Sequence, residues 1–147
     1  MELPTGWRTR HPTLTDVPEI LAVVHASDIA SVGYPDFGAD DVREVLTAPN
    51  CDPARDSWLA IDPAGEIVSW AYLENGTGGE QDFVEVYVHP ERGVPAQAPM
   101  LAIALARVAE RAAEFGYPRL TARAGAVPTE EHYIRVLRAA GFEFVKR

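Results

Sequence analysis

Apolar residues recur along the chain with two different periods, and the places where the period changes predict its secondary structure. The segment WRTRHPT (7–13) has the composition of a short first strand. After Thr15, apolar residues follow at i, i+3, i+4 and i+7; these are Val17, Ile20, Leu21 and Val24. This spacing predicts a helix with one buried face, and Thr15 is a suitable N-terminal cap.

A short helix and a hairpin are predicted next. Acidic residues followed by Val42, Val45 and Leu46 predict a helix over 40–46. The segments SWLAID (57–62) and EIVSWAYLE (66–74) flank the turn sequence PAG, which predicts two antiparallel strands joined by a tight turn.

The segment FVEVYVHP (83–90) has the clearest strand pattern in the chain. Successive side chains of a strand point to opposite faces, so the three valines share one face. The other face carries Phe83, Glu85 and Tyr87. The pattern therefore predicts a strand with one apolar face and one face that holds a carboxylate between two aromatic rings.

The C-terminal part predicts two more helices. Residues 100–115 form the longer one, with an apolar stripe and Gly116 as its C-terminal stop. The stripe consists of Leu101, Leu105, Val108, Ala112 and Phe115. The remaining elements are a strand over PRLTARA (118–124), a helix from Thr129 to Gly141, and a last strand in FEFVKR (142–147). The order of elements predicts a single α/β domain over 1–147 with an antiparallel start.

Composition and charge restrict the class of protein. The chain has 147 residues, a net charge of −9 and one cysteine, Cys51. An acidic chain repels a phosphate backbone on average, so we expect no nucleic-acid partner. We expect no membrane partner either, because no apolar run approaches the roughly 20 residues of a membrane span. The N-terminus has no apolar signal region, which favours a cytoplasmic location. The sequence contains no cluster of cysteine and histidine, so we expect no metal site.

Several segments carry a family resemblance over essentially the whole chain. With this order of elements, VHPER before a long helix and LRAAGFEFV at the end, the chain resembles the GCN5-related N-acetyltransferase superfamily. RTRHPTLTDVPEILAVVHASD, YPDFGADDVREVL and SWLAIDPAGEIVSWAYLE are similar to actinobacterial members related to mycothiol synthase, in which two such domains often lie in tandem. The resemblance implies a mixed, mostly antiparallel sheet flanked by about four helices. It also implies acetyl-CoA as acyl donor and a small-molecule amine as acceptor.

The resemblance also implies a cofactor-binding loop at the start of the long helix. In the superfamily, Arg/Gln-x-x-Gly-x-Gly/Ala presents backbone N–H groups to the diphosphate of acetyl-CoA. The residues in cofactor-binding positions here are Val86, Val88, Arg92, Gly93, Val94, Ala96, Gln97 and Ala98. Gly93 stands in place of the Arg or Gln, Ala96 in place of the first glycine, and Pro95 has no N–H. Arg92, one residue earlier, is the side chain that can replace the missing charged or polar contact to the phosphates.

The same resemblance suggests catalytic and substrate-binding residues. Glu85 is the candidate base, with a solvated strand carboxylate as the alternative. The superfamily's acid tyrosine, four residues before the final Gly-Phe, is replaced by Leu137. Tyr133, one turn earlier, is therefore the candidate acid acting through water, with a buried helix tyrosine as the alternative. The expected substrate-binding residues, for which core packing is the alternative, are Asp36, Trp70, Tyr72, Phe83 and Tyr87.

Two further hypotheses remain beside an acyltransferase. The altered loop and Leu137 also fit a degenerate domain without acyl-CoA turnover that serves as a binding or structural partner. Glu85 also allows acid–base chemistry on a substrate that is not a thioester. The chain ends at GFEFVKR, where relatives usually continue through another strand segment, so we expect a homodimer or a tandem partner to cover the edge.

Overall fold

The computed structural model describes residues 2–145 and contains one five-stranded sheet whose strands follow the order of the sequence. The strands are β1 (Arg8–Arg10), β2 (Ser57–Ile61), β3 (Ile67–Glu74), β4 (Gln81–Val88) and β5 (Thr121–Arg123). Neighbouring strands from β1 to β4 are antiparallel, and β4 and β5 are parallel. The hairpin predicted around PAG is confirmed as β2 and β3, whereas β1 and β5 are shorter than predicted.

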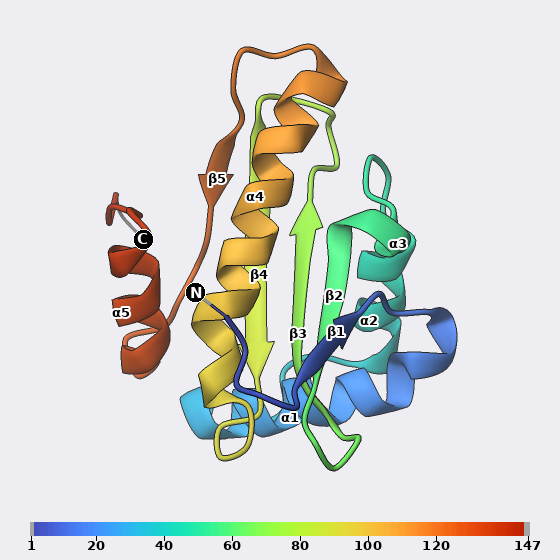
Figure 1. Cartoon of the computed structure of the whole chain (residues 1–147), viewed down its shortest axis with the longest axis vertical. Coiled ribbons are helices and arrows are strands. Elements are labelled where there is room, and N and C mark those ends of the chain that lie inside the picture. Colours follow the sequence, from blue (N-terminus) through green and yellow to red (C-terminus); the bar gives the residue numbers. More distant parts are fainter. Residues whose placement is uncertain (1, 146–147) are drawn as a thin grey trace.

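Helices cover both faces of the sheet (Figure 1). They are the 3-10 turns η1 (Leu14–Asp16) and η2 (Val94–Ala96) and the helices α1 (Val17–Val32), α2 (Ala39–Leu46), α3 (Pro53–Asp56), α4 (Gln97–Phe115) and α5 (Glu131–Ala139). The helix α4 crosses one face, α1 and α2 lie behind the other, and α5 stands beside β5. This arrangement confirms the predicted α/β fold with a mostly antiparallel central sheet.

Strand β4 separates two apolar cores because its side chains alternate between the faces. Val84, Val86 and Val88 are buried in the core beneath α4. On the other face, Tyr87 packs against a second core formed by α1, α2, β2 and β3. The predicted two-faced strand is therefore confirmed, and Glu85 shares its face with Tyr87.

A buried ion network fastens α4 to the sheet. The Arg111 guanidinium donates to both carboxylate oxygens of Asp82 at 2.8 and 3.0 Å and to Asp56 Oδ2 at 3.0 Å. Arg107 Nε donates to Asp56 Oδ1 at 2.7 Å. All four residues are buried, Asp82 completely. Each carboxylate thus has a cation in contact, which is the condition under which burial of charge is tolerated.

The start of α1 differs from the prediction. The turn η1, which is capped by Thr13, precedes the helix, and the N-cap of α1 is Asp16 instead of Thr15. The Thr13 backbone N–H donates to Asp16 Oδ2 at 2.8 Å, and the Arg10 guanidinium pairs with the same carboxylate. The Asp16 side chain, which the helical spacing alone does not single out, decides where the chain turns into α1.

The predicted last strand over 142–147 is wrong for residues 142–145, which have no regular secondary structure; 146–147 lie outside the described residues. Gly141 has a φ of 100°, and the Phe142 N–H donates to the Leu137 carbonyl at 3.0 Å, so the chain closes the end of α5. The neighbouring β5 is three residues long and gives an added strand little to pair with. The four-residue helix α3 was not predicted.

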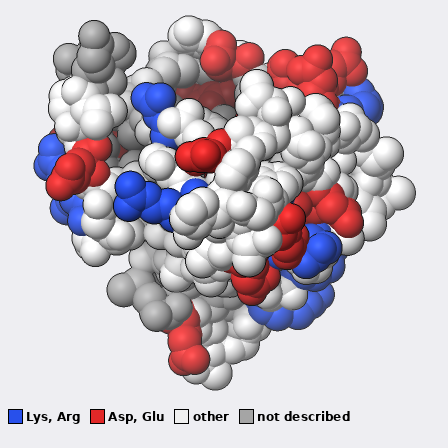
Figure 2. Space-filling view, turned by 90° about the horizontal axis from the view of Figure 1, so that it is seen from above, with Lys and Arg blue, Asp and Glu red and all other residues white. Residues whose placement is uncertain are grey.

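Figure 2 looks onto the upper end of the molecule in Figure 1, and there acidic and basic side chains lie in small groups, several of which adjoin a group of the opposite charge. Among the described residues, no helix is both long enough and apolar enough to span a bilayer.

We expect Arg111→Ala to lower the free energy of unfolding by about 3–5 kcal/mol, because it leaves Asp82 buried without its cation. Urea unfolding monitored by tryptophan fluorescence measures the loss. The matched control is Arg43→Ala, which removes an exposed ion pair with Asp40 and is expected to cost less than about 1 kcal/mol. Equal losses in the two variants would contradict the role given to the network.

Candidate functional site

The centre of the candidate site is Glu85 in β4, whose neighbour across the sheet is Tyr72 in β3. Four aromatic rings pack together on this face, and we refer to them as the aromatic cluster: Phe37, Trp70, Tyr72 and Tyr87. Ring centroids within the cluster are 4.4 to 6.4 Å apart. Glu85 is half-buried beside them. The sheet register therefore brings a carboxyl group against aromatic surface.

Members of the aromatic cluster differ in how accessible they are. Trp70 is fully buried, and its indole N–H donates to Ser57 Oγ at 2.9 Å, so it supports the site from beneath. Tyr72 is 4% exposed. Phe37 and Tyr87 are half-buried, and Phe83, further along the same face of β4, is 36% exposed. The rings that a ligand can reach are therefore Phe37, Tyr87 and Phe83.

The pKa of Glu85 is raised from 4.5 to about 8. Burial is the largest cause, and the carboxylates of Glu130, Glu74 and Asp28 add to it, while the Val86 backbone N–H opposes the shift. No Lys or Arg within residues 2–145 forms a salt bridge with Glu85. The site thus holds several acids, and none of the described cations is paired with Glu85.

The tyrosines around Glu85 stay neutral. Burial raises the pKa of Tyr72, Tyr87 and Tyr133 above its ordinary value, and the nearby Glu85 carboxylate raises it further. Their hydroxyl groups therefore remain hydrogen-bond donors and acceptors over the whole physiological range.

On the side of β4 towards β5, the backbone is covered by side chains instead of by a strand. Pairing with β5 runs from Gln81 to Phe83. Further along, the Val86 N–H donates to the Tyr133 hydroxyl at 3.3 Å, and the Val86 carbonyl accepts from Gln97 Nε2 at 3.3 Å. Tyr133 is thus bonded to the strand that carries Glu85, but from the opposite core.

The loop before α4 has little capacity left to bind phosphate through its backbone. The N–H groups of Glu91 and Arg92 donate to His89 Nδ1, and that of Gly93 donates to the His89 carbonyl. The N–H of Ala96 donates to the Gly93 carbonyl and that of Gln97 to the Val94 carbonyl. Pro95 and Pro99 have no N–H. Between residues 91 and 99, this leaves at most the amides of Val94 and Ala98.

Gly93 has a structural reason to be glycine. A Cβ atom there would lie 2.1 Å from the Val68 carbonyl oxygen and 2.7 Å from the His89 nitrogen. The long Arg or Gln side chain implied by the family resemblance therefore has no room at this position. Arg92 is exposed on the turn and is the one cation within 91–99.

Together these contacts test whether the loop fits acetyl-CoA. A diphosphate cradle needs several converging N–H donors, close glycine backbone or a fixed cation. The loop retains at most two uncommitted amides, with three residues between them, and its only cation is on a solvent-exposed turn. The residues present do not fit the diphosphate of acetyl-CoA in this conformation.

The acids of α1 and of the loop before α5 were missed by the sequence analysis. Asp28 is buried on the apolar face of α1, four residues after Val24, and its Oδ2 accepts from the backbone N–H groups of Asp36 and Phe37 at 3.0 and 3.2 Å. Asp36 itself has an exposed side chain. Asp28 could have been found from the sequence, because it is an acidic residue at a position where the helical spacing places apolar side chains. Glu130 had no comparable signal, because its position depends on the loop.

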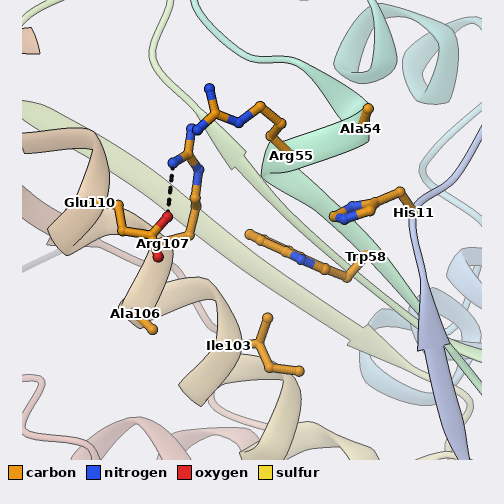
Figure 3. A pocket seen from close by; sticks show the side chains of 8 residues that line it. All are labelled: His11, Ala54, Arg55, Trp58, Ile103, Ala106, Arg107 and Glu110. Atoms are coloured by element: carbon orange, nitrogen blue, oxygen red, sulfur yellow. Dashed lines mark hydrogen bonds and ion pairs between the residues drawn. The ribbon is translucent and has the colours of Figure 1, made fainter. Parts of the chain in front are cut away.

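Two cavities flank the sheet. One, of about 420 Å³, lies between α4, α3 and β2 and is floored by Trp58 (Figure 3). Its charged groups are already paired: Arg107 with Asp56, Glu110 and Glu114, and Arg55 with Glu114. The other, of about 590 Å³, is lined by the end of β3, by Phe83 of β4 and by the end of β5. This second cavity adjoins the face that carries Glu85.

No protein-family model matches the chain, and no curated protein matches it significantly. Solved structures do match. A GCN5-related N-acetyltransferase from Sphaerobacter thermophilus is 23% identical with a TM-score of 0.82, covering 97% of this chain and 45% of that protein. A phosphinothricin acetyltransferase from Sinorhizobium meliloti in complex with acetyl-CoA is 18% identical with a TM-score of 0.67, covering 95% and 76%. The protein yncA from Salmonella typhimurium, solved with its cofactor acetyl-CoA, is 16% identical with a TM-score of 0.67, covering 97% and 82%.

These matches define the class of structure. The chain has the fold of the GCN5-related N-acetyltransferases, as the family resemblance implied. It spans less than half the length of the Sphaerobacter protein. At these identities the shared property is the fold, so the activity has to be argued from the residues of this chain.

Gly93→Ala is expected to lower the free energy of unfolding by about 1–3 kcal/mol, since the added methyl group collides with the Val68 carbonyl. The control is Gly76→Ala, where a Cβ meets nothing within 4 Å. Thermal and urea unfolding of both variants give the comparison. An unchanged stability of Gly93→Ala would show that the loop does not take this conformation.

Stability should also depend on pH through Glu85. Because its folded-state pKa is about 8 against an ordinary 4.5, the folded protein binds this proton more tightly than the unfolded chain. Its contribution to stability is complete below about pH 4.5 and is lost as the pH rises towards 8. Relative to the wild type, Glu85→Gln should therefore gain stability between pH 5 and pH 8.5, by about 1–3 kcal/mol. Parallel urea-unfolding profiles of the two proteins would contradict this.

Proposed function

We propose that the protein binds a small organic amine over Glu85, using the acceptor half of an N-acetyltransferase fold. The observation that carries this proposal is a half-buried carboxyl group beside aromatic rings, surrounded by further acids and without a cationic partner among residues 2–145. A protonated amine supplies the missing charge. The accessible rings offer faces on which a cation and its carbon skeleton can pack.

The raised pKa of Glu85 gives the site a chemical capacity as well. A carboxyl group with a pKa of about 8 exchanges protons readily near neutral pH. When an ammonium ion lies against it, Glu85 can accept the ammonium proton and leave a neutral, nucleophilic amine. Acid–base chemistry of this kind does not by itself require a thioester.

Acyl transfer from acetyl-CoA to the bound amine is the second candidate function. It is favoured by the fold, whose neighbours include proteins solved with acetyl-CoA, and by Glu85 as a base. The loop over 91–99 speaks against it, because most of its backbone donors are already bonded or absent. We therefore place amine binding without acyl-CoA turnover first.

Calorimetric titration with 2-phenylethylamine at pH 8.5 tests the proposal. We expect saturable binding that weakens about 10- to 100-fold in Glu85→Gln, which removes the charge-assisted contact. Binding should also weaken from pH 8.5 to pH 6, since Glu85 becomes protonated below its pKa of about 8 while the amine stays cationic. The control variant is Glu66→Gln, an exposed carboxylate in the turn between β2 and β3.

Titration with acetyl-CoA separates the two candidate functions. We expect no binding at millimolar concentration. Micromolar binding together with acetylation of an added amine, lost in Glu85→Gln, would establish the second function in place of the first. Equal amine binding by the wild type and Glu85→Gln would refute both.

A further inference from the structure

The cavity of about 590 Å³ beside β4 contains one cationic residue, Arg123. Glu74 and Phe83 line the same cavity, and the rest of its wall is formed largely by the turn after β3 and the chain after β5. Within residues 2–145, Arg123 forms no salt bridge and its side chain is exposed. A guanidinium group with five donors therefore faces an open cavity without a carboxylate on it.

The sheet register places these residues in one row. Glu74 of β3 is the partner of Phe83 in β4, and Phe83 is the partner of Arg123 in β5. Adjacent strands lie about 4.8 Å apart, so the acid and the cation stand on either side of the Phe83 ring. Glu85 lies two residues further along β4 on the same face. Diagonal neighbours of this kind have Cα atoms about 7–8 Å apart, within reach of long side chains.

The acidic and cationic ends of this row are complementary to the two charges of a zwitterion. A simple amine would leave Arg123 without a partner, and a simple anion would be repelled by Glu74 and Glu85. A molecule with an ammonium group and a carboxylate a few ångströms apart satisfies both ends. The exposed Phe83 ring between them offers apolar surface for a side chain.

We propose that the amine recognised at Glu85 is an α-amino acid with an apolar side chain, whose carboxylate is bound by Arg123 and whose side chain packs on Phe83. This inference rests on the proposed function and names the substrate class of the same site. The paired N–H groups of arginine match a carboxylate in a bidentate manner, so Arg123 is a specificity-determining residue. The cavity volume lies within the range of small-molecule sites.

The test compares amino acids with their decarboxylated counterparts by calorimetry at pH 8.5. The probes are L-phenylalanine, L-leucine and L-methionine against 2-phenylethylamine, 3-methylbutylamine and 3-(methylthio)propylamine. We expect at least one amino acid of the set to bind about 10-fold or more tightly than its amine. Arg123→Gln should abolish this preference without weakening binding of the amines, because it removes a cation near the ammonium group. Arg119→Gln, at an exposed arginine outside the cavity, should keep the preference.

The outcomes separate this inference from the proposed function. If the amines bind and depend on Glu85 but no amino acid binds more tightly, the zwitterion inference is overturned and amine binding stands. A preference for amino acids that survives in Arg123→Gln overturns the role of Arg123. If neither set binds at 10 mM, both the inference and the proposed function fail.

Discussion

The buried contact between Arg111 and Asp82 is the interaction on which the arrangement of the other elements depends. Asp82 is completely buried at the start of β4, and Arg111 binds it with two nitrogens while also reaching Asp56 at the end of α3. One guanidinium therefore joins the long helix α4, the short helix α3 and the strand that carries Glu85. Because charged hydrogen bonds of this type have fixed geometry, the network sets the register of α4 along the sheet.

That register has consequences at the far end of α4. The helix begins at Gln97, about 21 Å from Arg111 at 1.5 Å per residue, and there its side chain bonds the Val86 carbonyl. The turn before it folds back on His89, and Gly93 packs against the Val68 carbonyl. The loop between Gly93 and Gln97 is therefore fixed at both of its ends. In the conformation that results, most of its amides donate to acceptors within the protein and are not available to a phosphate.

Strand β4 keeps the two chemical halves of the fold apart. Its valine face belongs to the core under α4, and its other face presents Glu85 and Phe83 to the aromatic cluster and the adjoining cavity. A change in the loop before α4 therefore leaves the face that carries Glu85 intact, since the two faces belong to one strand but not to one surface. The proposed binding of an amine without acyl-CoA turnover requires this separation.

The sequence alone determined much of this picture, because some features depend on neighbouring residues only. The alternation over 83–88 predicted both faces of β4, the spacing over 100–115 predicted the buried stripe of α4, and Gly93, Pro95 and Ala96 marked the altered loop. Other features required the tertiary structure. The pairing of Arg111 with Asp82 joins residues 29 positions apart, and the row from Glu74 to Arg123 exists only once three strands are in register. The reason is physical: periodicity reports which face of an element is buried, whereas charge partners, the pKa of Glu85 and the space beside Gly93 are set by segments that meet only in the folded chain.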